Sequence, residues 1–163
     1  MITIPDGVTS IGSEAFIRCL SLTSIILPSS ITSIGLGAFY RLSLNVYISD
    51  LVSWCNITFG NESHPFAYGG DLYLNGELIT DLIIPKGVTS ISKYCFYYWR
   101  NLTSVTIPSS IIMIDSQAFQ GCTSLKTVYN NSKSIVIVRG DIENGQVGAY
   151  AEIVCNVNVE LDS

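Results

Sequence analysis

Hydrophobic and polar positions recur along this chain in a phrase that returns every 23 residues. The copy Leu102-Thr-Ser-Val105-Thr-Ile107-Pro108 shows it most clearly, because Val105 and Ile107 alternate with polar residues. That alternation predicts a half-buried strand, which Pro108 ends because proline has no N–H to donate. The same proline recurs at Pro5, Pro28, Pro85 and Pro108, and both 28 − 5 and 108 − 85 equal 23. A fixed period of about 20 to 29 residues predicts stacked units that bury their apolar side chains against neighbouring units.

The rest of each repeat predicts a turn, a second short strand and a helical turn. Ser109-Ser110 or Asp6-Gly7 follows the proline, and an extended piece such as Val8-Thr-Ser-Ile11 comes next. Gly12 and Gly35 permit a sharp bend. An Ala-Phe segment then places one aromatic side chain toward the core of each unit. We expect these side chains to form one buried column of Phe16, Phe39, Phe96 and Phe119.

The period breaks between residues 49 and 80. The segment from Ser49 to Cys55 predicts a short helix with Ser49 or Asp50 as N-cap and with Leu51, Trp54 and Cys55 on one face. Residues 56–70 are typical of a loop. Leu72-Tyr-Leu-Asn75-Gly76-Glu-Leu predicts a β-hairpin, since Asn-Gly suits a type I′ turn.

After Val128 the phrase is replaced by a different tail. We expect a turn at Gly140-Asp141, a helix over residues 147–154 and a final strand over residues 157–161. The expected organisation is therefore a solenoid over 1–129, with an irregular insert at 49–80, and a capping segment over 130–163. The first residues stand in mid-phrase on a repeat strand, so we expect the chain to be cut from a longer one.

The combination of Leu-x-x-Val-x-Ile-Pro, Val/Ile-Thr-Ser-Ile-Gly and Ala-Phe-x-x-Cys-x-x-Leu resembles the BspA-like leucine-rich repeats of bacterial and some protist surface proteins. The match rests on Leu22, Ile25, Leu27 and Pro28, on Leu102, Val105, Ile107 and Pro108, and on Leu125 and Val128. The insert also resembles one seen within this family, through Asp50, Trp54-Cys55 and Leu72 to Glu77.

The resemblance implies a β-rich α/β solenoid, a leucine-rich-repeat right-handed superhelix with a mid-chain insert. The segment with Gly145, Val147, Tyr150 and Ala151 is similar to the family's terminal segment, which implies a C-terminal cap. Leucine-rich repeats often carry Asn or Cys after the strand. Here Ser29, Ser30, Ser109 and Ser110 stand in that stretch.

Composition and charge narrow the functional classes. The chain of 163 residues is 48% hydrophobic and 13% charged, as expected when every repeat contributes to a shared core. Its net charge is −5 with scattered Lys and Arg, which disfavours nucleic acid as a partner. No apolar run reaches the roughly 18–20 residues of a membrane span, so no membrane insertion of this segment is expected.

Residues with catalytic or metal-binding chemistry are few and scattered. The five cysteines include no CxxC pair, and Cys19, Cys95 and Cys122 occupy inward positions of the repeat, so we expect buried free thiols. The single histidine, His64, has no acid at a recognisable spacing, and Cys55 is a remote candidate nucleophile for it. Asp50, Asp71 and Asp81 are more typical of caps or solvated surface. The sequence predicts no enzyme, no cofactor and no metal site.

Two columns of outward residues are candidates for binding a partner. Homologous strand positions lie about 4.8 Å apart across a ladder, so a row of outward residues could form one stripe, subject to the insert. That row is Thr3, Ile26, Tyr47, Ile83, Thr106 and Tyr129. A second column follows the core phenylalanine, with Tyr40 and Tyr97 and with Tyr94 and Tyr98 nearby. Ordinary β-propensity and scattered surface hydrophobics are the competing explanation for both columns.

Three functions stay open from the sequence. The resemblance implies a non-catalytic protein-interaction module, adhesin-like, of a secreted or cell-surface protein that binds a host or cell-surface protein. A structural spacer that presents other domains without a ligand of its own is the alternative. An enzyme using Cys55 and His64 is the third. An outward apolar stripe favours the first, a polar ribbon the second, and a deep cleft joining Cys55 to His64 the third.

Overall fold

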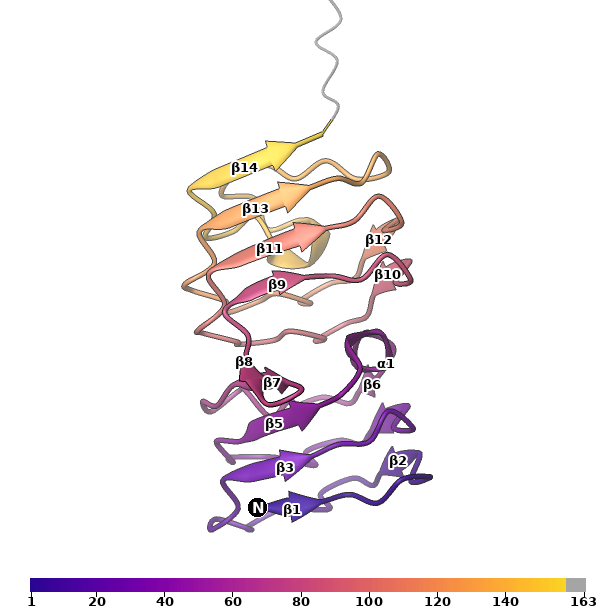
Figure 1. The fold of residues 1–163 in the computed structure, drawn as a ribbon. Coiled ribbons are helices and arrows are strands. Elements are labelled where there is room, and N and C mark those ends of the chain that lie inside the picture. Colours follow the sequence, from indigo (N-terminus) through magenta and orange to yellow (C-terminus); the bar gives the residue numbers. More distant parts are fainter. Residues whose placement is uncertain (158–163) are drawn as a thin grey trace, which may run out of the picture.

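The structure of the protein, a computed structural model, describes residues 1–157. These residues coil into a solenoid in which successive turns stack one above another (Figure 1). Each repeat gives one strand to a first face, which we call the ribbon, and most give a shorter strand to a second face. The repeating units predicted from the 23-residue period are therefore confirmed as a β-rich solenoid.

The elements are short, as expected for units that bury their side chains against neighbours. The strands of the ribbon are β1 (Ile2–Thr3), β3 (Ser24–Ile26), β5 (Asn45–Ile48), β7 (Leu72–Leu74), β8 (Glu77–Leu78), β9 (Asp81–Ile83), β11 (Ser104–Ile107), β13 (Thr127–Asn130) and β14 (Ile153–Asn156). The second face holds β2 (Ser10–Ile11), β4 (Ser33–Ile34), β6 (Thr58–Phe59), β10 (Ser90–Ile91) and β12 (Met113–Ile114). Helical structure is confined to α1 (Leu51–Cys55) and the 3₁₀ turn η1 (Asn144–Gln146) within the described chain.

The sequence period reappears as the register of the strands. Ile2 is paired with Ile25 and Ser104 with Thr127, so each step along the stack is 25 − 2 = 23 or 127 − 104 = 23 residues. All strand pairs in the described residues are parallel except β7 with β8. Parallel strands need a connection on the far side, which the turns and the second face supply.

Serine side chains connect the turns that follow the ribbon strands. The Ser30 hydroxyl donates to the Val8 carbonyl at 2.7 Å and accepts the Gly7 N–H at 3.2 Å. Ser110 donates to the Val88 carbonyl at 2.7 Å in the equivalent place. Ser30 and Ser110, in the stretch where leucine-rich repeats often carry Asn or Cys, therefore link their turns to the preceding repeat and satisfy turn carbonyls that no strand reaches.

The phenylalanine predicted to fill the core recurs at Phe16, Phe39, Phe96 and Phe119. Phe39, Phe96 and Phe119 are fully buried, whereas Phe16 is only half-buried. Phe16 stacks on Phe39 with ring centroids 5.4 Å apart, and Phe96 lies 5.1 Å from Phe119. Between the two pairs the insert contributes Phe66, which contacts Trp99 at 5.7 Å. The single column expected from the sequence is thus two separate pairs, of which the second is joined to Phe66 through Trp99.

The helix predicted at the start of the insert is confirmed as α1. Asp50 is its N-cap, and its carboxylate accepts the N–H groups of Val52 and Ser53, each at 3.1 Å. The Ser53 hydroxyl also donates to this carboxylate, and it is the main reason that the pKa of Asp50 lies below its usual value. Trp54 and Cys55 are buried, as the sequence predicted.

The predicted hairpin is also confirmed, and it extends the ribbon. Asn75 and Gly76 have φ values of 52° and 87°, the left-handed pair of a type I′ turn between β7 and β8. Strand β7 pairs in parallel with β5, so Tyr73 lies beside Tyr47. The loop before the hairpin was expected to be irregular but contains β6, which pairs with β4 on the second face.

Strand pairing stops at the insert on both faces of the solenoid. Within the described residues the ribbon is two sheets, β1-β3-β5-β7-β8 and β14-β13-β11-β9, and on the second face β2-β4-β6 is separate from β10-β12. Figure 1 shows the hairpin and α1 at this level of the stack. Side chains must therefore hold the two halves together.

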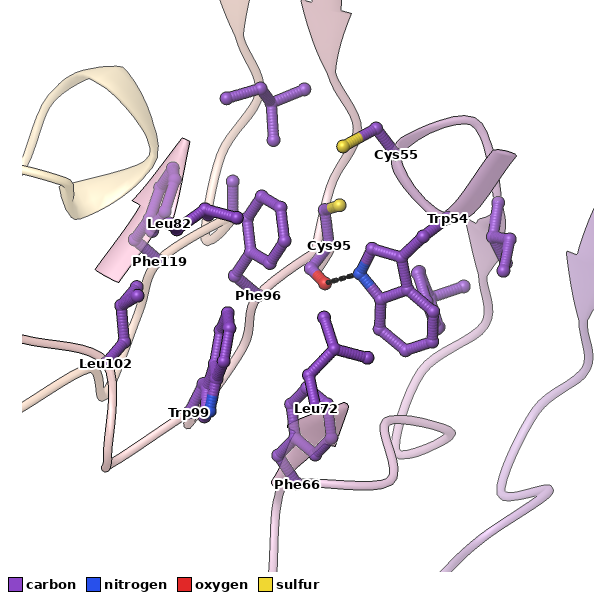
Figure 2. Packing of buried hydrophobic residues seen from close by; sticks show 14 of the residues in the cluster. Trp54, Cys55, Phe66, Leu72, Leu82, Cys95, Phe96, Trp99, Leu102 and Phe119 are labelled. Carbon is purple, nitrogen blue, oxygen red and sulfur yellow. Dashed lines mark hydrogen bonds between the residues drawn. The ribbon is translucent and has the colours of Figure 1, made fainter. Parts of the chain in front are cut away.

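One backbone carbonyl accepts two of the hydrogen bonds that cross this junction, and the Ser92 hydroxyl makes others to the Cys55 and Ile57 carbonyls. The indole Nε1 of Trp54 donates to the Cys95 oxygen at 3.2 Å, a bond drawn in Figure 2. His64 Nε2 lies 3.1 Å from the same oxygen, and its Nδ1 lies 3.4 Å from the N–H of Phe66. We assign the tautomer that donates from Nε2 and accepts at Nδ1, because it satisfies both contacts. Two buried side chains of the insert thus bind one carbonyl of the following repeat.

The prediction of a helix over residues 147–154 is wrong. Residues 147–150 form a turn, and β14 follows and pairs in parallel with β13. The open edge of β13 offers backbone partners that a helix cannot use, and apolar spacing alone did not separate the two outcomes. The predicted final strand begins at Val157, which lies in a turn, and its other residues fall outside the described part.

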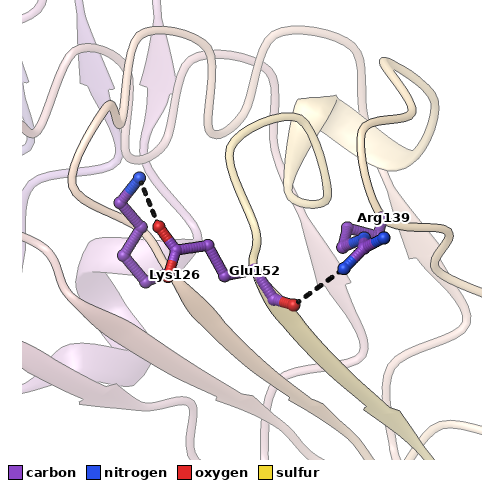
Figure 3. A network of polar contacts seen from close by, with 3 residues as sticks. All are labelled: Lys126, Arg139 and Glu152. Atoms are coloured by element: carbon purple, nitrogen blue, oxygen red, sulfur yellow. Dashed lines mark hydrogen bonds and ion pairs between the residues drawn. The ribbon is translucent and has the colours of Figure 1, made fainter.

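Polar contacts fasten this last turn to the stack. Asn130 is buried, and its side-chain amide donates to Asn156 Oδ1 at 2.8 Å and to the Ile135 carbonyl at 2.9 Å. Lys126 and Glu152 form an ion pair at 3.1 Å on the surface, near Arg139 (Figure 3). Because that pair is exposed, the asparagine contacts contribute more to the stability of this turn.

The prediction for the cysteines is confirmed at two positions and wrong at one. Cys95 and Cys122 are fully buried, and burial raises the pKa of the Cys122 thiol to about 12. Cys19 is exposed because it lies on the first turn, which has a neighbouring turn on one side within the described residues. All five cysteines are free thiols, and Cys55 is buried while Cys155 is exposed.

Replacing Phe96 with Ala is expected to cost about 3–5 kcal/mol of unfolding free energy, because the ring is fully buried between Trp99 and Phe119. Phe16→Ala is the matched control at the equivalent, half-buried position, and its cost is expected to be less than half as large. Urea unfolding of both variants measures the difference. Equal costs would contradict the burial pattern of the column.

The burial of His64 is expected to make the protein less stable in acid. Burial lowers the folded-state pKa of His64 to about 3, against an ordinary 6.5, although the Cys95 carbonyl raises it slightly. Between these values the unfolded chain binds a proton that the folded chain does not. Stability therefore falls as the pH drops through this window, by about 1.4 kcal/mol per pH unit from this group.

Urea unfolding at several pH values tests this for wild type and for His64→Gln, which keeps a donor for the Cys95 carbonyl. The variant is expected to lose stability less steeply between about pH 6.5 and pH 3. Identical slopes for the two proteins would show that His64 is not held neutral.

Candidate interaction surfaces

The outward residues predicted for the ribbon lie at paired positions, but in two rows. Thr3 is paired with Ile26 and Ile26 with Tyr47, whereas Ile83, Thr106 and Tyr129 form a separate set. The single stripe considered from the sequence is therefore divided, because the insert ends one sheet at β8 and the next begins at β9.

The row on the first sheet is the more aromatic. It continues past Tyr47 to Tyr73 and then to Leu78, which the sequence did not assign to it. The rings of Tyr47 and Tyr73 are stacked, with centroids 4.5 Å apart and an angle of 18° between their planes. Leu78 is 47% exposed. Ile26, Tyr47 and Tyr73 are half-buried, so the row from Ile26 to Leu78 presents part of each side chain on adjacent paired strands.

A shallow groove adjoins the ends of these strands. Its volume is about 450 Å³, and it is lined by Ile26 and Tyr47 together with Asp6 and the hairpin residue Asn75. The hairpin thus adds a polar wall to the aromatic row. The arrangement suits a protein segment that lays apolar side chains across the sheet and meets polar groups at its border.

The row on the second sheet contains fewer aromatic residues than the row on the first sheet. Ile83 is 71% exposed and Tyr129 is 46% exposed, while Thr106 between them is half-buried. Asp81, at the start of β9, accepts hydrogen bonds from the hydroxyls of Ser104 at 2.6 Å and Thr103 at 2.9 Å. These bonds hold its pKa below the usual value, so Asp81 fastens neighbouring strands.

The structure gathers the predicted tyrosine patch into one groove, which we call the tyrosine groove. Its volume is about 480 Å³, and it lies between the insert loop of residues 60–68 and the segment of residues 94–98. The side chains that line it include Asn61, Glu62, Tyr68, Tyr94, Tyr97 and Tyr98. Tyr40, the remaining member of the predicted patch, contacts Tyr68 edge-on at 5.8 Å beside the groove.

Contacts among the tyrosines fix the shape of this groove. Tyr97 lies at the centre, with ring centroids 5.2 Å from Tyr94 and 4.5 Å from Tyr98. The Tyr94 hydroxyl donates to Asn61 Oδ1 at 3.2 Å, which ties the two walls together. Tyr98 packs flat on Gly121, where an added Cβ would lie 2.6 Å from the ring.

Positive φ angles at two of these tyrosines belong to the repeat itself, since the equivalent residues Glu14, Gln117, Arg18 and Arg41 have them too. Tyr94 and Tyr98 have φ values of 65° and 58°, in the left-handed region that costs a bulky residue about 1–2 kcal/mol. The equivalent position of Tyr98 one repeat later is Gly121, with φ of 78°. Two tyrosines therefore occupy positions that favour glycine, and the repeat geometry holds them there.

The pKa values of two phenols in the groove are raised, mainly by burial, and the carboxylate of Glu62 contributes to both shifts. Burial is the main cause that raises the pKa of Tyr97, and the neighbouring phenols and Glu62 raise it further. The pKa of Tyr68 is raised by burial, then by Tyr40 and Glu62, while the charge of Arg41 lowers it. Glu62 thus lies close enough to influence phenols on both walls of the groove.

The arrangement gives no support to catalysis by Cys55 and His64. The His64 ring is packed among aromatic residues, with centroids 4.7 Å from Phe59 and 4.8 Å from Phe66. Both of its nitrogens are engaged with backbone groups. Cys55 is buried beside Cys95 (Figure 2), and it is not among the residues that line the tyrosine groove with His64.

Metal and membrane chemistry were also considered for the described chain. No three His, Cys, Asp or Glu side chains within residues 1–157 gather as ligands for a metal ion. No helix in this part of the protein has the length and apolar character needed to cross a membrane.

Several residues of these surfaces were missed from the sequence, and Leu78 of the hairpin is one of them. Tyr73 stands between two leucines in a strand pattern, and this alternation could have placed it in the outward row. Tyr68 and Glu62 lie in the insert loop, where no period applies. Their place opposite residues 94–98 depends on how the insert folds, which local pattern does not reveal.

Comparison with known proteins agrees with the repeat architecture. The family model described as the BspA type leucine rich repeat region matches six copies, over residues 1–63 and 70–141. No curated protein matches the sequence significantly.

Two solved structures are similar to this chain. One is a leucine rich cell surface protein from Faecalibacterium prausnitzii A2-165, with 18% identity over 98% of this chain and a TM-score of 0.43. The other is a leucine-rich repeat protein from Eubacterium ventriosum ATCC 27560, with 18% identity over 80% of this chain and a TM-score of 0.32. The chain spans 60% of the length of each. The match of the family model over most of the chain shows that this protein belongs to the BspA type leucine-rich repeat family.

Proposed function

We propose that this chain is a non-catalytic protein-interaction module, adhesin-like, of a secreted or cell-surface protein. Leucine-rich repeats are generally interaction modules, which supports the broad class. The single observation that carries the proposal is the aromatic row on the first sheet, where Ile26, Tyr47, Tyr73 and Leu78 point outward from paired strands. A merely solvated face needs no such row.

The row has the properties of a binding surface for a host or cell-surface protein. Stacked Tyr47 and Tyr73 offer a large contact area whose rotamers are already restricted, so little entropy is lost on binding. Hot spots of protein interfaces are enriched in such aromatic residues. On the second sheet, Ile83, Thr106 and Tyr129 form a separate and less aromatic contact area.

The alternative is a spacer solenoid that presents other domains and has no ligand of its own. The polar Thr3 and Thr106 in the two rows are what a spacer would show throughout. We also propose that the solenoid of residues 1–129 coils in a right-handed sense. Residues 130–163 would then act as its C-terminal cap.

The test compares the two rows by mutation. One variant carries Ile26→Ser, Tyr47→Ser and Tyr73→Ser, and the matched variant carries Ile83→Ser and Tyr129→Ser. Binding to purified matrix and serum proteins immobilised on a sensor surface is measured after thermal unfolding confirms that both variants fold. The first variant is expected to lose at least tenfold in affinity for a protein that wild type binds, or about 1.4 kcal/mol, and the second variant to lose less.

A folded first variant that binds as tightly as wild type would remove the aromatic row from the interaction. Wild type that binds no member of the panel, with both rows intact, would favour the spacer.

A further inference from the structure

Cations of the chain itself already cover three tyrosines around the tyrosine groove. Arg41 lies over the ring of Tyr40 at 5.2 Å from the centroid, Lys93 over Tyr94 at 4.8 Å and Arg100 over Tyr98 at 5.6 Å. A cation within about 6 Å of a ring centroid is attracted by the negative face of the ring. Basic side chains are therefore attracted to this group of rings.

Two tyrosines that line the groove have no such cation within the described chain, namely Tyr68 and Tyr97. They are the same two phenols that Glu62 influences from the insert loop. Tyr68 is 46% exposed, so its ring is accessible from solvent. Of the four tyrosines that line the groove, Tyr94 and Tyr98 therefore already have a cation of the chain over the ring, whereas Tyr68 and Tyr97 do not.

Glu62 gives the lining its formal charge. It is exposed, it forms no ion pair within residues 1–157, and none of Arg41, Lys93 and Arg100 lines the groove. The neighbouring His64 is buried and held neutral by its surroundings, so it adds no positive charge. Glu62 is therefore the one charged side chain among the described residues that line the groove, while Arg41, Lys93 and Arg100 lie over tyrosines at its border.

We propose that the tyrosine groove binds an arginine or lysine side chain presented by the protein partner. The basic group would lie between Tyr68 and Tyr97, with its charge facing Glu62 and its methylene stem along the rings. A volume of about 480 Å³ is ample for one such side chain. This inference rests on the proposed function, because it names the chemistry of the partner, but it uses a surface distinct from the aromatic row.

Other ligand classes fit these observations less well. An acidic group would meet Glu62 and the phenol oxygens without a basic side chain among the lining residues. A neutral carbohydrate could stack on tyrosine rings, but it would gain no charge–charge attraction to Glu62. The experiment therefore compares a cation with a neutral group of the same shape.

The probes are N-acetyl-arginine amide and N-acetyl-citrulline amide, which differ in charge but hardly in shape. Each is titrated into the millimolar range against the folded chain with ¹³C-labelled tyrosine, and the ring resonances are followed by NMR. Saturable shifts are expected at Tyr68 and Tyr97 with the arginine probe, with Tyr150 as an unaffected reference outside the groove. The citrulline probe is expected to bind at least about fivefold more weakly.

Two variants with the same change of net charge locate the effect. Glu62→Gln is expected to lower the affinity for the arginine probe at least about fivefold. Glu143→Gln, which changes an exposed residue outside the groove, is expected to leave this affinity unchanged. Equal binding of both probes, or equal effects of both variants, would overturn the proposal. So would saturable binding of a neutral oligosaccharide without binding of the arginine probe. None of these results would bear on the aromatic row, whose test uses other residues.

Discussion

The junction at the insert, where two hydrogen bonds reach the Cys95 carbonyl inside a continuous apolar core, is the constraint that joins the two halves of this structure. Elsewhere in the solenoid, each turn is held to the next by paired strands, but pairing stops at the insert on both faces. Trp54 and His64 donate to the same oxygen there, within aromatic residues that exclude water. A buried carbonyl left without partners costs about 1–3 kcal/mol, so the junction is stable only when the insert folds as it does.

The same junction produces the candidate binding surfaces. Because His64 is held against Cys95, the loop of residues 60–68 lies opposite residues 94–98, and the tyrosine groove forms between them. Because β7 joins β5, Tyr73 extends the aromatic row on the first sheet. The insert thus interrupts the regular ladder and at the same time supplies the residues that distinguish this solenoid from a uniform stack.

Sequence pattern was sufficient wherever local rules decide the outcome. The 23-residue period, the strands ended by proline, the helix capped by Asp50 and the Asn75-Gly76 hairpin all follow from neighbouring residues. Prediction from sequence pattern failed where the local structure depends on contacts with distant parts of the chain. Residues 147–154 form a turn and a strand because β13 has a free edge, and Cys19 is exposed because of its place on the first turn. The tyrosine groove was predicted only in part, since Tyr94, Tyr97 and Tyr98 were expected to gather, but the opposite wall comes from the insert loop of residues 60–68, where no period applies.

Native-state hydrogen exchange is the most direct test of the claim that the insert joins the two sheets. In wild type, the amides of Val46 in β5 and Val105 in β11 are expected to exchange through one common unfolding with equal free energies. In a variant with Trp54→Phe and His64→Phe, which removes both donors to Cys95 but keeps aromatic packing, the two amides should exchange with different free energies. Unequal free energies already in wild type, or a common value that persists in the double variant, would contradict this account.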